Sequence, residues 1–141
     1  MKYEIFSYLG INNIKINSSR EDVRNNLGTN FKEFVKVKGK LPSDFYTEEG
    51  IIIYYKENFF CEAIEMFNPC NVTYKEKFLL KMRYNEVLEF LKQFDINIYA
   101  EVDGFVSIAL GIGGYCPNAK NNDFFESIIC FEKGYYKNLY K

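Results

Sequence analysis

Two stretches of the chain, Arg20-Glu-Asp-Val-Arg-Asn-Asn-Leu27 and Tyr84-Asn-Glu-Val-Leu-Glu-Phe-Leu91, share one pattern at an offset of 64 residues. In each, a valine and a leucine four positions apart stand on one face of a helix, which predicts a short amphipathic helix. Cys61-Glu-Ala-Ile-Glu-Met-Phe67 and Phe125-Glu-Ser-Ile-Ile-Cys-Phe131 recur at the same offset and resemble half-buried strands. The common offset indicates a duplicated unit of a helix followed by a hairpin.

A glycine-led turn is expected between the helix and the last strand of each unit. Glu49-Gly50-Ile51-Ile52 resembles Asp103-Gly104-Phe105-Val106 at an offset of 54, so ten residues missing before the second hairpin would be regained inside it. We predict repeats over about 11–68 and 75–132 of a single domain, 1–141. One copy is too small to bury both its helix and its sheet, and two copies would complete a shared core.

The predicted fold class is α+β: an antiparallel sheet with two helices packed on one face, built from two tandem helix-plus-hairpin repeats. Ser18 with Glu21, or Ser19 with Asp22, can cap the first helix, and Gly28 can end it. The second helix is predicted from Arg83 to Phe94, and Gly111 to Gly114 are expected to form a bulge or bend. Strands are predicted at 2–9, 31–38, 50–55, 61–67, 73–81, 96–102, 105–110 and 124–131.

Composition excludes several classes of protein. The 141 residues are 48% hydrophobic, with 14 Phe and 12 Tyr, which argues against disorder. With 18 basic and 19 acidic residues spread along the chain, there is no broad positive field, and we do not expect a nucleic-acid partner. No apolar run reaches the length of a membrane span and no export signal is evident, which predicts a cytoplasmic protein with reduced, buried cysteines.

The chain offers little catalytic equipment. It has no histidine, so Ser-His and Cys-His pairs are excluded, and its four cysteines do not form a Cys-x-x-Cys motif. We therefore expect no metal, no cofactor and no catalytic residues. Glu62 and Glu126 are the paired carboxylates that the repeat selects, and strand alternation places each at the rim of a buried face.

The segment Ile16-x-x-x-Arg20-Glu-Asp-Val-Arg-x-x-Leu27-Gly28, followed by a glycine-led hairpin, resembles the repeat of the small outer-membrane assembly lipoproteins of the SmpA and BamE type. A tandem copy of that unit is similar to the architecture of the β-lactamase inhibitory protein, which grips its target with the exposed face of its sheet. The chain departs from the lipoproteins because it lacks an acylated N-terminal cysteine, so membrane assembly is not carried over.

We therefore expect a protein-binding role, specifically an inhibitor such as the immunity protein of a bacterial toxin, acting as a monomer or homodimer on a toxin domain. The alternatives are a carboxylate-dependent enzyme using Glu62 and Glu126, and a structural or assembly module. Exposed tyrosines and the long loop after the glycine cluster at 111–114 supply the predicted contact residues. They are Tyr54, Tyr55, Tyr115, Asn118, Lys120 and Asp123.

Overall fold

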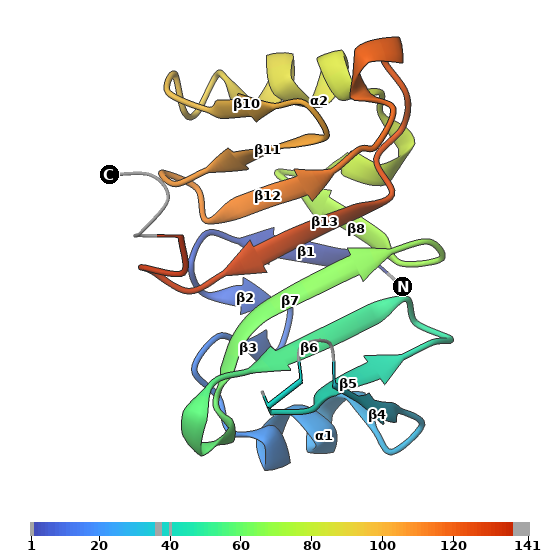
Figure 1. The fold of residues 1–141 in the computed structure, drawn as a ribbon, viewed down its shortest axis with the longest axis vertical. Coiled ribbons are helices and arrows are strands. Elements are labelled where there is room, and N and C mark those ends of the chain that lie inside the picture. The colour runs from blue at the N-terminus through green and yellow to red at the C-terminus, as the bar shows by residue number, and fades with distance from the viewer. Residues whose placement is uncertain (1, 36–37, 40, 137–141) are drawn as a thin grey trace.

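The structure is a computed structural model that describes residues 2–35, 38–39 and 41–136. Its two sheets lie one behind the other, and the larger is wholly antiparallel (Figure 1). The order of the large sheet is β10-β11-β12-β13-β7-β6-β5-β4. Its strands are β4 (Lys32–Phe34), β5 (Ser43–Tyr46), β6 (Ile51–Tyr55), β7 (Cys61–Phe67), β10 (Tyr99–Glu101), β11 (Gly104–Ser107), β12 (Ile112–Tyr115) and β13 (Ser127–Phe131).

The large sheet consists of two meanders of four strands, which meet where β7 pairs with β13. In each meander the first strand lies at an edge of the sheet and the last strand lies at the centre. The two halves of the sheet therefore have the same strand order, counted inward from either edge. At the junction, the pairs Ala63–Phe131 and Phe67–Ser127 lie at equal distances on either side of the pair Glu65–Ile129. The strand order and register therefore have a local two-fold axis, which passes through Glu65 and Ile129.

The small sheet has the order β3-β2-β1-β8-β9, in which β1 separates two short hairpins. β1 pairs antiparallel with β2 but parallel with β8. The prediction of one antiparallel sheet was therefore wrong, although the α+β class with two helices is confirmed. The sequence gives no local signal for a parallel pairing between strands so far apart in the chain. The strands are β1 (Lys2–Phe6), β2 (Gly10–Ile11), β3 (Ile14–Lys15), β8 (Asn71–Tyr74) and β9 (Lys77–Phe78).

The predicted strand at 73–81 is instead the hairpin of β8 and β9, followed by a short helical turn. Lys75 and Glu76 both have positive φ angles, as the two central residues of a tight hairpin turn require. The three 3-10 turns of the described chain are η1 (Glu57–Phe59), η2 (Leu79–Lys81) and η3 (Ala119–Asn121).

Both predicted helices are present, as α1 (Arg20–Leu27) and α2 (Tyr84–Leu91). The Ser19 hydroxyl accepts a hydrogen bond from the Asp22 amide, so Ser19 rather than Ser18 is the expected serine that caps α1. At the start of α2, the Arg83 amide donates to the Glu86 carboxylate. Neither helix, nor any other helix of the described chain, is long and apolar enough to cross a membrane.

The glycine turns of the two meanders differ from the expected alignment. The amide of Gly50 donates to the Tyr46 carbonyl, and its carbonyl accepts from Phe67. Gly111 makes the same two bonds, to Ser107 and Phe131, and both glycines have positive φ, 74° and 70°. The counterpart of Gly50 is therefore Gly111, 61 residues later, whereas Gly104 begins β11.

The expected ten-residue exchange between the two connections is consequently wrong. The helices are 64 residues apart, the glycine turns 61 and the last strands 64. Relative to the first meander, the second has three residues fewer before its glycine turn and three more after it. The predicted bend at residues 111–114 is largely strand β12, since only Gly111 of this glycine cluster has positive φ. Glu49-Gly50 and Asp103-Gly104 look alike in sequence, but their backbone hydrogen bonds show that they occupy different positions in the two meanders.

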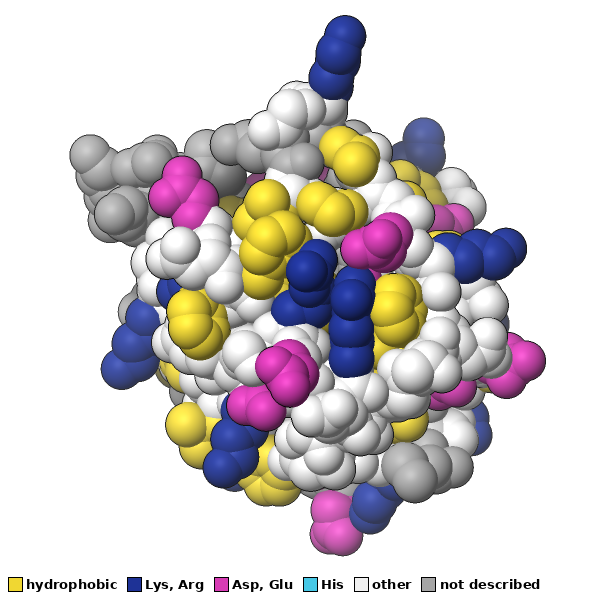
Figure 2. Space-filling view, turned by 90° about the horizontal axis from the view of Figure 1, so that it is seen from below, with side chains coloured by type: hydrophobic (Ala, Val, Ile, Leu, Met, Phe, Trp, Pro, Cys, Tyr) yellow, Lys and Arg dark blue, Asp and Glu magenta, His cyan; other side chains and the backbone are white. Residues whose placement is uncertain are grey.

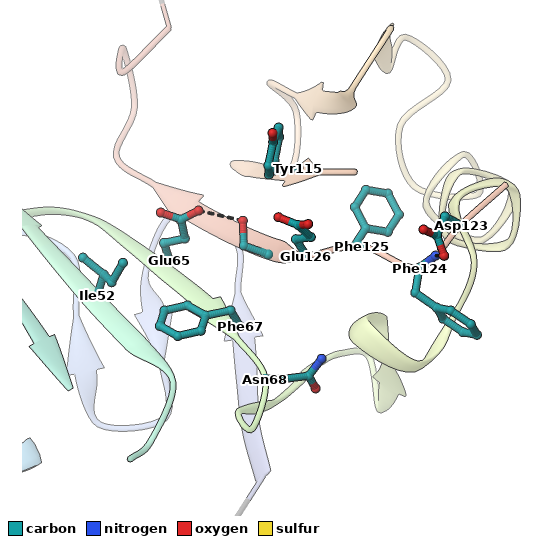
Figure 3. A pocket seen from close by; sticks show the side chains of 10 residues that line it. Ile52, Glu65, Phe67, Asn68, Tyr115, Asp123, Phe124, Phe125 and Glu126 are labelled. Carbon is teal, nitrogen blue, oxygen red and sulfur yellow. Dashed lines mark hydrogen bonds between the residues drawn. The ribbon is translucent and has the colours of Figure 1, made fainter. Parts of the chain in front are cut away.

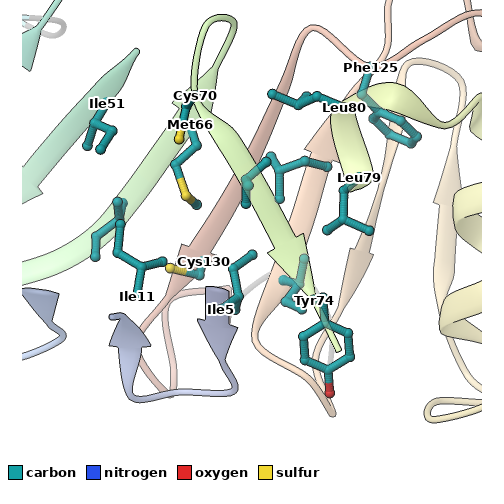
Figure 4. Packing of buried hydrophobic residues seen from close by; sticks show 14 of the residues in the cluster. Ile5, Ile11, Ile51, Met66, Cys70, Tyr74, Leu79, Leu80, Phe125 and Cys130 are labelled. Atoms are coloured by element: carbon teal, nitrogen blue, oxygen red, sulfur yellow. The ribbon is translucent and has the colours of Figure 1, made fainter. Parts of the chain in front are cut away.

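The main core lies between the two sheets and includes both helices (Figure 4). Met66 and Cys130 of the large sheet lie near Ile5 and Ile11 of the small sheet in this layer. Val23 of α1 and four residues of α2 belong to the same cluster. All four cysteines of the chain are buried free thiols. The core therefore unites every layer of the fold on one side of the large sheet.

Arg24 of α1 is tied to the large sheet by an ion pair with the buried Asp44, in which the arginine itself is partly exposed. Its Nε and Nη2 atoms each donate to the Asp44 carboxylate at 2.8 Å, and the Tyr55 hydroxyl also donates to Asp44 at 2.8 Å. Side-chain hydrogen bonding to Asp44 raises the pKa of Arg24 further above its usual range. Figure 2 shows the end of the molecule that carries α1, where basic side chains lie between hydrophobic and acidic ones.

Arg24→Ala should lower the free energy of unfolding by about 3 kcal/mol, because the Asp44 carboxylate, only 1% exposed, would lose its charge partner. Urea denaturation of the two proteins measures this difference. Lys2→Ala is the matched control, since Lys2 forms a long, exposed pair with Glu76 at 4.0 Å and should change stability by less than about 0.5 kcal/mol. Equal effects of both variants would contradict the role of the pair with Asp44.

The protein should lose stability in alkali. Burial raises the pKa of the Cys70 thiol, the Cys130 thiol and the Tyr46 hydroxyl to about 12. In the unfolded chain the pKa of a thiol is about 8.5 and that of a tyrosine is about 10. Between these values and 12 the unfolded state binds fewer protons. The contribution of these groups to the free energy of unfolding should therefore be constant below about pH 8 and fall as pH rises towards 12.

Urea denaturation at a series of pH values checks this alkaline loss of stability. The variant Cys130→Ala should lose part of the pH dependence, whatever its stability at neutral pH. A flat profile between about pH 8.5 and 11 would show that these groups ionise in the folded state without cost.

Candidate functional site

The large sheet has a second face, pointing away from the small sheet and the core, which we call the outer face. Tyr54, Ala63, Val106 and Phe131 are buried there and form a separate apolar cluster. Neither the helices nor the strands of the small sheet contribute to this cluster, as far as the described residues go. Further members that are partly buried are Tyr8, Phe34, Ile52, Ile108, Ile129, Tyr135 and Tyr136.

A carboxylate lies at the centre of the outer face. Glu65 of β7 accepts hydrogen bonds from the Tyr54 hydroxyl and the Ser127 hydroxyl, each at 2.6 Å. Glu65 belongs to the residue pair on the local two-fold axis, and its partner is the apolar Ile129. Burial, reinforced by the hydrogen bond to Glu65, raises the pKa of Tyr54 well above its usual range. The network fixes a half-buried negative charge on an otherwise apolar surface.

One end of the outer face is covered by the chain itself, after β13. The ring of Tyr135 stacks on Phe131 at 5.6 Å between centroids, and the ring of Tyr136 meets Phe131 edge-on at 4.9 Å. Tyr8 packs on the same ring at 6.0 Å, and its hydroxyl donates to the Ile108 carbonyl. Phe131 is consequently 1% exposed.

The opposite end of the outer face is open and contains a cavity of about 570 Å³, which we call the Phe67 cavity (Figure 3). β7 and the turn after it form one wall, and the segment that leads into β13 forms the other. The segments meet because β7 pairs with β13. The lining residues are Ile52, Glu65, Phe67, Asn68, Tyr115, Asp123, Phe124, Phe125, Glu126 and Ser127.

A second cavity of about 450 Å³ lies over β11, β12 and β13 and shares Glu65, Tyr115 and Ser127 with the first. Tyr135 and Tyr136 belong to its lining. The two cavities therefore form adjoining parts of one hollowed surface, with Glu65 between them.

The charges on this surface have one sign. Asp123 and Glu126 join Glu65 in the lining of the Phe67 cavity, and Glu101 and Asp103 line the second cavity. Among the described residues, no lysine or arginine lines either cavity. Low-dielectric walls lined by like charges concentrate the field, so the surface attracts cationic groups.

The structure distributes the predicted contact residues over different places. Tyr115, whose side chain is exposed, and Asp123 both line the Phe67 cavity. Tyr54 lies on the outer face but is buried, whereas Tyr55 points into the core and binds Asp44. Asn118 donates to the Asp123 carboxylate at 3.3 Å, and Lys120 is exposed in η3 outside both linings.

The two predicted rim carboxylates are not brought together. The Glu62 carbonyl accepts from the Glu132 amide at one end of the β7–β13 pair, while Glu126 precedes Ser127 at the other end. Six residues of extended chain between 126 and 132 correspond to about 20 Å. Glu126 lines the Phe67 cavity and Glu62 does not, so these two carboxylates do not form one site.

No group of three or more acidic or cysteine side chains within the described ranges is placed to hold a metal ion. No protein-family model matches the chain, and neither a curated protein nor a solved structure is significantly similar to it. The site has to be interpreted from its own geometry.

Sequence reasoning missed Glu65 and Phe67, the two residues of β7 that are central to the outer face. Their alternation with the buried Ile64 and Met66 was visible in the sequence and indicates a shared face. Ser127 and Phe124 carry no such signal, because their position beside Phe67 depends on the register between β7 and β13.

Tyr54→Phe should lower the free energy of unfolding by about 1 to 1.5 kcal/mol, since the Glu65 carboxylate loses a hydrogen bond in a half-buried place. Thermal or urea denaturation measures the change. Tyr115→Phe is the matched control, because the Tyr115 side chain is 45% exposed, and it should be neutral within about 0.5 kcal/mol. A neutral Tyr54→Phe would show that the bond does not hold the centre of the outer face.

Proposed function

We propose that this protein binds another protein through the outer face of its large sheet, and that it acts in the cytoplasm as an inhibitor, such as the immunity protein of a bacterial toxin. The observation that carries the proposal is the outer face itself: an apolar and aromatic sheet surface, hollowed at its open end, that the helices and the small sheet leave uncovered.

The composition of this surface is typical of a protein interface. Aromatic residues are enriched in the centres of interfaces, where they supply large contact areas at low entropic cost. Tyr115 and Phe124 are 45% and 42% exposed, and both line the Phe67 cavity. The half-buried Phe67 lines the same cavity. An exposed aromatic cluster beside a fixed charge favours a protein partner over a small polar metabolite.

We further propose that the fold is built from two copies of one unit, each a short hairpin, a helix and a four-stranded meander. Support comes from contacts that recur 64 residues apart. Ser19 forms an isolated bridge with Phe60, and Arg83 forms the equivalent bridge with Phe124. β1 has no counterpart in the second unit and is the central strand of the small sheet, between the two hairpins.

The duplication bears on function because it makes the binding face continuous. A four-stranded meander alone has an open edge at its last strand, which exposes unpaired backbone groups. Pairing β7 with β13 removes that edge from both meanders and joins their outer faces into one surface. The proposed inhibitor therefore presents one wide sheet to its partner.

The test begins with the genes that flank the coding sequence: co-expression with tagged protein should recover one neighbour's product as a stoichiometric complex. Tyr115→Ala should weaken that complex by about 2 kcal/mol, or about 30-fold, as truncation of a central aromatic does. Calorimetry measures the affinity. Ile96→Ala is the control, because Ile96 is exposed and lies outside both cavities.

If the recovered protein is a toxin, co-expression should restore growth of cells that make it, and Tyr115→Ala should reduce this protection. A complex that is weakened by Ile96→Ala but not by Tyr115→Ala would place the interface elsewhere and contradict the proposal.

A further inference from the structure

The local two-fold axis relates the Phe67 cavity to the end of the outer face that the chain covers. Under the register of β7 and β13, Phe67 corresponds to Phe131 and Ser127 corresponds to Ala63. On the neighbouring strands Tyr115 corresponds to Tyr54, which is the equivalent residue of β6, 61 positions earlier. Three residues of the open cavity thus have counterparts at the other end.

Those three counterparts are the residues that the C-terminal segment covers. Tyr135 and Tyr136 pack on Phe131 and belong to one cluster with Tyr54 and Ala63. Tyr54 is 9% exposed, whereas its counterpart Tyr115 is 45% exposed. The outer face thus has similar aromatic residues at both ends, and Tyr135 and Tyr136 cover those at one end.

The two covering tyrosines have lysines beside them in the sequence. Lys133 precedes the two tyrosines, and Lys137 follows them in the sequence. The Lys133 ammonium lies 5.7 Å from the centroid of the Tyr8 ring, beside Phe131. The open end has the complementary charge, because Glu65, Asp123 and Glu126 line it without a lysine or arginine among the described residues.

The surroundings of the Phe67 cavity leave room for a ring. Phe45 contacts Phe67 from the side of β5, at 5.3 Å between centroids, but Phe45 is not part of the lining. Arg83 stacks on Phe124 at 4.6 Å, and it too lies outside the lining. The volume of about 570 Å³ falls within the range of about 300–1,000 Å³ of typical ligand pockets.

We propose that the Phe67 cavity receives an aromatic side chain of the protein partner, from a segment that carries lysine or arginine next to it. The partner's ring would pack on Phe67 and Tyr115 as Tyr135 packs on Phe131, and its cation would face Glu126 and Asp123. This inference rests on the proposed function and specifies the chemistry of the partner.

The test uses isolated protein and a capped peptide with the sequence Lys-Gly-Tyr-Tyr-Lys, which copies residues 133–137. We expect saturable chemical-shift changes in NMR spectra of the labelled protein at Phe67, Tyr115 and Ser127. A peptide with alanine in place of both tyrosines should not bind. A peptide with glutamate in place of both lysines should bind at least about tenfold more weakly, as like charges replace opposite ones.

Protein variants separate the ring from the charge. Tyr115→Ala should abolish the shifts at Phe67, and Glu126→Gln should weaken binding about threefold and reduce its dependence on salt. Glu21→Gln removes the same charge from exposed α1 and should leave peptide binding unchanged. Unchanged folding of each variant is verified by its own NMR spectrum.

Three results would overturn the inference: no shifts at the cavity, shifts confined to Phe131 and Tyr54, or equal binding of the lysine and glutamate peptides. Its failure is distinguishable from that of the proposed function. If Tyr115→Ala weakens the complex with the genetic neighbour but the peptide does not bind, the outer face is the interface and only the chemistry of the occupant is wrong. If the peptide binds as expected and no protein partner uses the outer face, the function is wrong.

Discussion

The fold depends on the antiparallel pairing of β7 with β13. This single ladder joins two four-stranded meanders into one sheet, and its register fixes which residues face each other across the local two-fold axis. Because side chains alternate along a strand, a shift of one residue would turn Ile64 and Met66 from the core to solvent. The buried pattern of β7 therefore holds the register, and with it the cavity between Phe67 and the segment before β13.

The candidate site results from differences between the two halves of the large sheet. The two-fold axis carries Glu65 on one strand and Ile129 on the other, so a charge replaces an apolar side chain at the centre of the outer face. The three residues added between β12 and β13, relative to the first meander, lengthen the loop that supplies Asp123 and Phe124 to the cavity. Chain beyond β13 covers the other end with Tyr135 and Tyr136. Similar strands thus support two unlike ends.

Local features of the sequence predicted local structure well. The helices follow from apolar spacing and from capping by Ser19, both of which act within a few residues. The α+β class follows from the same patterns. The second sheet and its parallel pair were missed, because pairing of β1 with β8 depends on packing between residues far apart in sequence. For the site, the tyrosines were selected by type. Strand alternation alone implies that Tyr54 and Tyr55 face opposite ways, but the cavity itself depends on non-local register.

The position of β1 has a consequence for how the chain reaches this fold. β1 precedes β2 and β8 in the chain, yet it lies between them in the sheet, and β8 follows β7. β1 can therefore pair only with β2 until the chain up to β8 has been made. Such long-range pairing closes large loops and slows folding, and it exposes a strand edge meanwhile. Glu4, at the centre of β1, accepts a hydrogen bond from Thr73 of β8, and a charged side chain on an unpaired edge discourages pairing with other chains. Glu4 therefore protects the edge of β1 before β8 is made and binds Thr73 once the two strands have paired.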